Sequence, residues 1–251
     1  MTFYHLESIK TKKIIKEAVS YTLDPQGHPL DVVYDYKYIR AKLNLYDLKH
    51  TPISHLKYLD FYPIADRSLV VTKGEGNTPL HHLEALGKHF KLPNLFLKNE
   101  GLNPTGVFKD RGSMVEITKA KERKAKAVCV ASTGNMAASV SAYAAQAGLP
   151  CYVLVPEGTP IGKLAQTLSY GARVLQIRGT YDDCVRLVRE MARKYGYFLC
   201  GDYAWRREGQ KSTSYEIVEQ LGWRAPDIVI CPVGFGSNFA ALYKGFAEFK
   251  K

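Results

Sequence analysis

The sequence predicts an α/β protein built on a mostly parallel, buried sheet. From Leu95 onward, short apolar runs alternate with longer stretches of helical periodicity, and this alternation requires crossover connections between parallel strands. The stretch 181–195 carries apolar residues on one broad face and Arg and Lys on the other, as expected for a helix that covers a sheet. A further strand, turn and helix begin at Asp227. The 251 residues suffice for one large domain or two modest ones.

The first 70 residues have a different pattern from the remainder. A turn-rich break at 24–29 precedes the alternating run 31–36, which predicts a strand. The run 74–80, Gly-Glu-Gly-Asn-Thr-Pro-Leu, predicts a turn that leads into a helical stretch beginning near His81.

The alternating part of the chain defines its elements in order. The predicted strands are 95–97, 127–131, 151–155 and 174–177, and the predicted helices are 111–121, 135–147, 161–170 and 181–195. A second parallel unit follows, with a strand at 227–232, a Gly-rich turn and a helix from about Asn238. Because this unit opens close to the end of the sequence, we expect the second domain to be incomplete.

The charge of the chain favours anionic small molecules over nucleic acid as ligands. The formal net charge is +11 and its excess is spread along the sequence. The densest basic run, 119–126, contains no aromatic residues of the kind that stack on bases, so we interpret it as a solvated helix end and expect no nucleic-acid partner. A positive balance suits a phosphorylated cofactor and an anionic substrate.

Cysteine and histidine usage indicates neither disulfides nor a metal site. The five cysteines lack C-x-x-C spacing and several lie in apolar runs, which predicts buried free thiols in a reducing compartment. All seven histidines lie at or before His89 and none forms H-E-x-x-H. The N-terminus, beginning Met1-Thr2, has no signal-peptide pattern, and no window approaches the roughly 20 apolar residues of a membrane helix. We therefore expect a soluble, cytoplasmic protein without a membrane partner.

Lys109 is the first candidate for chemistry. It follows the bend Asn103-Pro104-Thr105-Gly106 and the apolar Phe108, just before a predicted helix. Desolvation and the field of the helix N-terminus both disfavour an ammonium there, and a neutral amine can attack an aldehyde. A single lysine is more often a solvated surface group.

Two further segments lie between a strand and a helix, where backbone amides can bind an anion. In 131–139 the polar candidates are Ser132, Thr133 and Asn135, although a plain Ser/Thr helix cap is as good an interpretation. The other segment is Gly234-Phe235-Gly236-Ser237-Asn238, whose glycines let the backbone approach a phosphate. A Gly-x-Gly turn alone is a weak signal, and Phe239 breaks the dinucleotide fingerprint.

Taken together, these motifs resemble the threonine synthase family. The resemblance rests on 74–80, 97–106 with 108–112, 131–135, 170–172, 208–212 and 219–223, which keep the family's order over roughly 71–251. It implies the fold type II architecture, two three-layer α/β domains with mostly parallel sheets and the cofactor between them. Val107, Met136 and Phe235 depart from the family's usual residues.

The resemblance also implies roles for the candidate residues. Lys109 would be the catalytic residue, carrying pyridoxal 5'-phosphate as a Schiff base, and Phe108 would pack beside the ring. Asn135 would bond the cofactor's 3-hydroxyl, and Ser132 and Thr133 would hold the substrate. The backbone of Gly234, Phe235, Gly236, Ser237 and Asn238 would bind the cofactor phosphate.

The reaction that the resemblance implies converts O-phosphohomoserine and water to threonine and phosphate, and the expected class is a carbon–oxygen lyase acting on phosphates. The expected division is an N-terminal segment 1–75, a boundary region 76–111 with the lysine, a small α/β domain 112–202 and the start of a large domain 203–251. Alternatives are cysteate synthesis from phosphoserine, a threonine dehydratase-like reaction, and an inactive truncated chain. A homodimer is one expected assembly, and no metal is expected.

Overall fold

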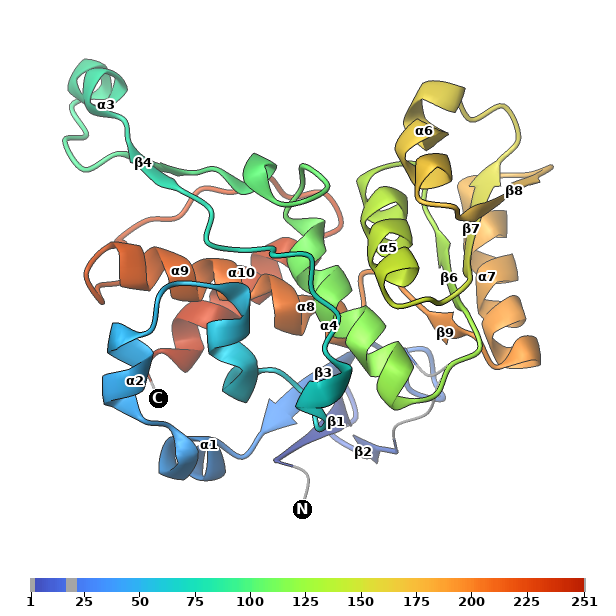
Figure 1. Cartoon of the computed structure of the whole chain (residues 1–251), viewed down its shortest axis with the longest axis horizontal. Coiled ribbons are helices and arrows are strands. Elements are labelled where there is room, and N and C mark those ends of the chain that lie inside the picture. Colours follow the sequence, from blue (N-terminus) through green and yellow to red (C-terminus); the bar gives the residue numbers. More distant parts are fainter. Residues whose placement is uncertain (1–2, 17–21, 251) are drawn as a thin grey trace.

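The computed structural model describes residues 3–16 and 22–250, so Met1, Thr2 and Lys251, which belong to the first and last predicted segments, lie outside the described residues. Helix α4 runs between two groups of elements (Figure 1), and it packs against α8 on one side and α5 on the other. The strands are β1 Tyr4–Ser8, β2 Ile14–Ile15, β3 Leu30–Tyr34, β4 Leu80–His82, β5 Phe96–Lys98, β6 Val128–Ala131, β7 Cys151–Pro156, β8 Arg173–Ile177 and β9 Phe198–Leu199. The helices are α1 Tyr36–Lys42, α2 Leu45–His50, α3 Glu84–Phe90, α4 Lys109–Glu122, α5 Asn135–Gln146, α6 Ile161–Ser169, α7 Tyr181–Tyr195, α8 Ala204–Gln210, α9 Ser212–Gln220 and α10 Ser237–Glu248, with 3₁₀ turns η1 His55–Phe61, η2 Arg67–Leu69 and η3 Glu100–Leu102.

The predicted parallel sheet is confirmed in the second half of the chain. Its strand order is β8-β7-β6-β9 and every pair is parallel. Val128 and Val130 face α5, whereas Cys129 and Ala131 face α7, because successive side chains on a strand point to opposite faces. The sheet is therefore the middle of three layers, as its continuous apolar strands predict.

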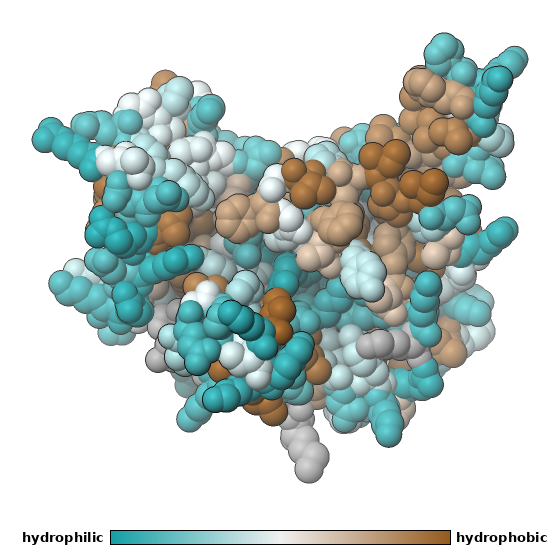
Figure 2. All heavy atoms as spheres, turned by 180° about the vertical axis from the view of Figure 1, so that it is seen from behind, coloured by the Kyte–Doolittle hydropathy of each residue, from teal (hydrophilic) through white to brown (hydrophobic). Residues whose placement is uncertain are grey.

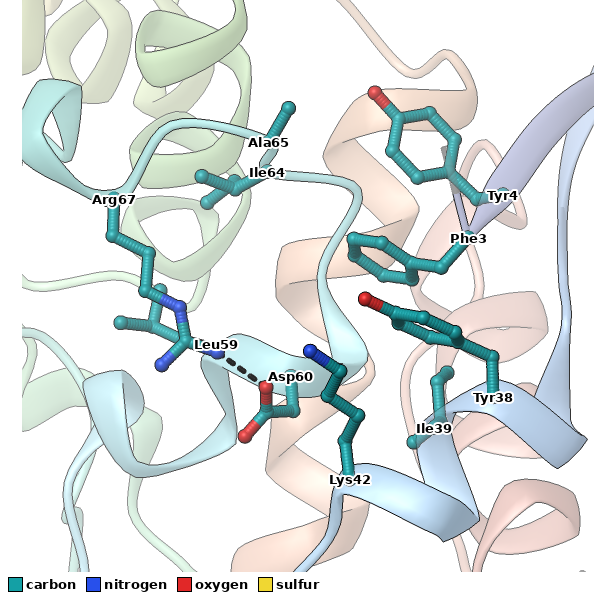
Figure 3. A pocket seen from close by; sticks show the side chains of 10 residues that line it. All are labelled: Phe3, Tyr4, Tyr38, Ile39, Lys42, Leu59, Asp60, Ile64, Ala65 and Arg67. Carbon is teal, nitrogen blue, oxygen red and sulfur yellow. Dashed lines mark hydrogen bonds and ion pairs between the residues drawn. The ribbon is translucent and has the colours of Figure 1, made fainter. Parts of the chain in front are cut away.

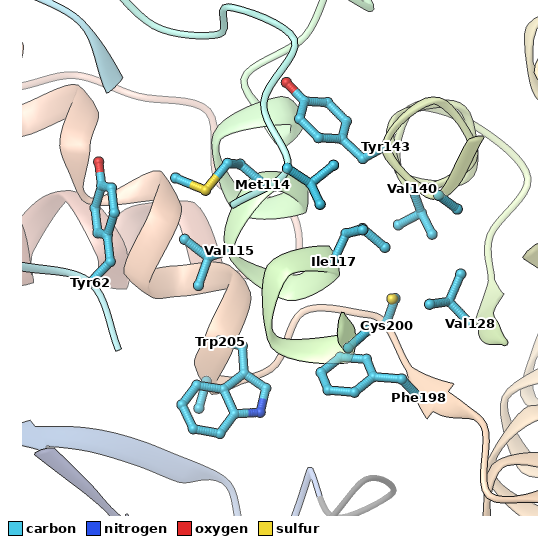
Figure 4. Close-up of a cluster of buried hydrophobic side chains, with 14 of the residues drawn as sticks. Tyr62, Met114, Val115, Ile117, Val128, Val140, Tyr143, Phe198, Cys200 and Trp205 are labelled. Carbon is cyan, nitrogen blue, oxygen red and sulfur yellow. The ribbon is translucent and has the colours of Figure 1, made fainter. Parts of the chain in front are cut away.

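The predicted elements from 111 to 195 agree with the structure within two residues. Helix α7 occupies 181–195 as expected, and a capping box at Thr180 and Asp183 fixes its start. Helix α4 begins at Lys109 rather than after it. Its apolar side chains occupy the centre of the core (Figure 4), where Met114 and Ile117 are fully buried.

The N-terminal half forms small antiparallel sheets. Strand β3, predicted as 31–36, pairs with β1 in the order β2-β1-β3. The helical stretch predicted to begin near His81 is present but begins at Glu84, as α3, because residues 80–82 form β4 and pair with β5. Strand β5 was expected in the parallel sheet and instead closes this separate antiparallel pair.

Two other expectations were wrong. The run 227–232 is not a strand: it makes no backbone hydrogen bond within the described residues, and Ile230 is 93% exposed. The basic run 119–126 is not wholly solvated, because Lys119 is buried with its Nζ 2.7 Å from the Tyr4 hydroxyl and 2.7 Å from a Glu122 carboxylate oxygen.

Four cysteines, Cys129, Cys151, Cys184 and Cys200, are buried free thiols, as predicted, and Cys231 is half-buried. Within residues 3–16 and 22–250, no helix is both long and apolar enough to cross a bilayer, and no group of three or more His, Cys, Asp or Glu side chains is arranged to hold a metal ion.

Candidate active site

Lys109 lies in a largely buried position at the start of α4. Its side chain is 15% exposed, and its Nζ donates to Asp202 at 3.1 Å and lies 5.1 Å from the centroid of the Phe108 ring. Burial lowers the pKa of Lys109 and the positive charge of Arg206 lowers it further, while Asp202 raises it. The amine is therefore closer to its neutral form than an ordinary lysine.

The same carboxylate reaches the glycine-containing turn. The Ser237 hydroxyl donates to Asp202 Oδ1 at 2.5 Å, so Lys109 and Ser237 share one acceptor. Gly236 precedes α10 with φ of +89°, a left-handed conformation that suits glycine. The N-terminal amides of α10 are thus presented beside the lysine.

The turn leaves room and polar atoms for a ligand. A Cβ added to Gly234 or Gly236 would meet no atom within 4 Å. The Asn238 side-chain oxygen is buried with no partner among the described residues, and an amide can offer either a donor or an acceptor. The Phe235 side chain is 81% exposed, so its contribution to the turn is its backbone.

Arg206 of α8 braces the lysine end of α4. Its guanidinium donates to the Lys109 carbonyl at 2.9 Å and forms a buried ion pair with Glu116. Burial raises the pKa of Glu116 to about 7, although Arg206 and a hydrogen bond from the Gly201 amide oppose this. A Cβ on Gly112 would lie 2.5 Å from the Arg206 side chain, so this close approach needs glycine.

Asp110 joins α4 to α5, which carries the second anion-binding candidate. Its carboxylate accepts hydrogen bonds from Ser139 of α5 and from Thr105, each hydroxyl at 2.6 Å. Burial raises the pKa of Asp110, while both hydroxyls lower it. The N-terminus of α5 is thereby held at a fixed distance from Lys109.

The segment before α5 borders a cavity of about 330 Å³. Thr133 and Asn135 line it together with Lys163 of α6. Ser132 is not among its lining residues, and the Ser132 hydroxyl accepts from the amides of Gly134 and Ala137, both at 3.3 Å. The structure therefore separates Ser132, which caps the helix, from Thr133 and Asn135, which face open space.

A larger cavity of about 400 Å³ lies near the N-terminal sheet and contains none of the predicted site residues. Figure 3 shows Phe3 and Tyr38 stacked on one side of it, with Lys42 beside them and the Arg67–Asp60 ion pair opposite.

The sequence interpretation missed Asp202, Arg206 and Lys163. Asp202 follows β9, a two-residue strand too short to be recognised by periodicity. Its position after a parallel strand, where ligands bind at the carboxyl ends of strands, is therefore visible only in the structure.

A three-layer α/β fold with a desolvated lysine beside a glycine turn defines the class of fold type II pyridoxal-phosphate enzymes. The family model described as pyridoxal-phosphate dependent enzyme matches residues 71–251. The chain belongs to this family.

The chain is similar to several proteins named threonine synthase. It is 44% identical to the one from Methanocaldococcus jannaschii over 226 residues, covering 89% of this chain and 56% of the relative. For the one from Methanosarcina acetivorans the identity is 42% over 250 residues, covering 98% and 61%. The chain thus spans little more than half the length of these relatives.

Solved structures support the same fold. Threonine deaminase isoform 2 from Solanum lycopersicum matches with a TM-score of 0.61 and 26% identity, covering 68% of this chain and 47% of that one. Serine racemase from Dictyostelium discoideum matches with a TM-score of 0.60 and 28% identity, covering 66% and 54%.

Proposed function

We propose that this chain binds pyridoxal phosphate through Lys109 and takes part in converting O-phosphohomoserine and water to threonine and phosphate. The observation that carries the proposal is the placement of the Lys109 amine, which is withdrawn from water and linked through Asp202 to Ser237 of the glycine turn. Similarity to proteins named threonine synthase supports the choice of substrate.

The residues present fit a phosphorylated aldehyde. The amides of the turn 234–238 and the positive end of α10 suit a phosphate. The unpartnered Asn238 oxygen is an acceptor, so it suits a donor group of the ligand rather than its phosphate. Lys109 can hold or release a proton at Nζ, since its pKa is lowered by burial. When bound, the cofactor supplies the electron sink.

The substrate would lie at the N-terminus of α5. Thr133 and Asn135 border its cavity, and the Lys163 ammonium adds a positive charge for a phosphate or carboxylate. Asn135 remains our candidate for the cofactor hydroxyl and Ser132 for the substrate, in the latter case after its cap bonds are exchanged.

The test of cofactor attachment is borohydride trapping. We expect the chain mixed with pyridoxal phosphate to gain a visible absorbance band and, after reduction, a cofactor adduct on the peptide that contains Lys109. Lys109→Ala should lose both, whereas Lys163→Ala should retain both. An unchanged band in Lys109→Ala would refute the assignment.

The test of the reaction compares substrates. Phosphate release should be faster from O-phosphohomoserine than from O-phosphoserine, because the relatives are named for threonine synthesis. Faster release from O-phosphoserine would favour cysteate synthesis, and ketone formation from threonine would favour a dehydratase. Cofactor uptake without any product would favour an inactive chain.

We further propose a cytoplasmic location, supported by the buried free thiols, and a homodimer. The division at 1–75, 76–111, 112–202 and 203–251 also stays a proposal. Limited proteolysis that releases a stable fragment beginning just before α4 and ending near 202 would support it, since α4 starts at Lys109 and β6–β9 and α5–α7 all fall within that range.

A further inference from the structure

Asp202 lies in the turn between β9 and α8, and its side chain is 10% exposed. Lys109 Nζ is 3.1 and 3.4 Å from its two carboxylate oxygens, and the Ser237 hydroxyl is 2.5 Å from one of them. One acid therefore connects the start of α4 with the start of α10, two elements far apart in sequence.

No other charged group near Lys109 among the described residues connects its amine with the start of α10. Arg206 of α8 is positive and bonds the Lys109 carbonyl. Glu116, two turns along α4, is engaged by Arg206 and the Gly201 amide. Among the described residues, Asp202 is the one carboxylate that forms an ion pair with Lys109 Nζ.

The Asp202 carboxylate also lies beside the glycine turn, where a phosphate could bind. A carboxylate at the N-terminus of α10 occupies the kind of position that a phosphate would take. Ser237 is buried and its hydroxyl is already committed to Asp202. A ligand phosphate that bonded Ser237 would therefore have to exchange with Asp202.

We propose that Asp202 is a positioning residue, whose carboxylate holds the Lys109 ammonium against the first turn of α10 until a phosphorylated ligand replaces these contacts. The proposal rests on the proposed role of Lys109. Under this proposal, Asp202, which is not among the site residues predicted from the sequence, controls the protonation of the Lys109 amine.

The test measures the amine directly, without cofactor or substrate. The whole chain is labelled with trace acetic anhydride across a pH series, and acetylation of Lys109 is followed by peptide mass spectrometry. Asp202→Asn should move the midpoint of Lys109 reactivity down by about one pH unit, because an opposite charge at this distance favours the charged form. Asp202→Glu keeps the negative charge, so its midpoint of Lys109 reactivity should lie close to that of the wild type.

The controls separate charge from structure. Asp182→Asn, which removes an exposed carboxylate on α7, should leave the midpoint in place. An unchanged or raised midpoint in Asp202→Asn would overturn the proposal, since mere loosening exposes the amine and raises its pKa.

Folding is checked in the same samples. Lys211 is fully buried and paired with Glu208 and Glu248, so it should stay protected from acetylation. If Asp202→Asn exposes Lys211 to acetylation, the test relies on Asp202→Glu instead. A midpoint of Lys109 reactivity in Asp202→Glu that differs from the wild-type midpoint then overturns the proposal. No outcome depends on turnover, so failure of the proposed reaction would be seen separately.

Discussion

Glu75 is a fully buried carboxylate whose partners come from three parts of the chain. His55 Nδ1 lies 3.0 Å from it, the Tyr143 hydroxyl donates at 2.5 Å, and the Lys73 amide donates at 3.0 Å. Burial raises the pKa of Glu75, but these hydrogen bonds and the charge of His55 outweigh it and bring the pKa down to about 2. The ionised form is therefore the one that the folded chain stabilises.

A pH dependence of stability follows from Glu75. The folded pKa of about 2 lies below the ordinary value of 4.5, so its contribution is complete above pH 4.5 and is lost as the pH falls toward 2. We expect the wild type to exceed Glu75→Gln by about 3 kcal/mol in unfolding free energy at pH 6, on the basis of about 1.4 kcal/mol per pKa unit.

Urea unfolding at several pH values measures this difference. It should shrink between pH 5 and pH 2. Glu84→Gln, which alters an 83% exposed side chain, serves as the control and should parallel the wild type. A constant gap between wild type and Glu75→Gln would contradict the assignment.

At this scale the lysine was predictable from its sequence context and its acid partner was not. Lys109 stands next to Phe108 and at a helix start, both visible in the sequence. Asp202 contacts it across 93 residues, and only the packing of α8 on α4 brings the two together.

The burial of helix α4 and of the run 227–232 is the reverse of what the composition of each segment suggests. Ile117 of α4 is fully buried in the main core, on the side of Val140 of α5 (Figure 4), whereas Ile230 is 93% exposed. The sequence of α4 is mostly polar or charged, whereas the run 227–232 is mostly apolar. An apolar run forms a strand only when another strand satisfies its backbone groups. Composition alone could not predict that difference.

The same substitution at Ile117 and at Ile230 should therefore have different effects on stability. Ile117→Ala should cost about 2–5 kcal/mol of unfolding free energy, because it leaves a cavity in the core. Ile230→Ala should change it by no more than about 0.5 kcal/mol. Denaturant unfolding monitored by circular dichroism compares the two, and equal losses would show that 227–232 is packed in solution.

Considered as a whole, the molecule exposes more apolar side chains in its last segment than a soluble monomer needs. Ile228 is 79% exposed, Val233 62% and Tyr243 72%. The view from behind shows apolar side chains gathered along the upper part of that face (Figure 2). Contiguous apolar surface of this kind favours association.

Self-association should accordingly depend on this surface. We expect the apparent mass in light scattering to rise with protein concentration, and the double variant Ile228→Ser/Ile230→Ser to lower it at each concentration. Leu45→Ser, at a 62% exposed site on α2, is the control. If the double variant and wild type behave alike, the proposed dimer uses another face.

The sequence by itself determined the parallel strands β6, β7 and β8 and the helices from 111 to 195, and it singled out Lys109 as the candidate, because periodicity and local motifs are properties of neighbouring residues. The tertiary structure decided that Asp202, Arg206 and Ser237 surround Lys109, that Lys119 is buried, and that β4 and β5 stand apart from the main sheet. Such contacts join residues distant in the chain, and their energy depends on desolvation, which exists only once the elements have packed.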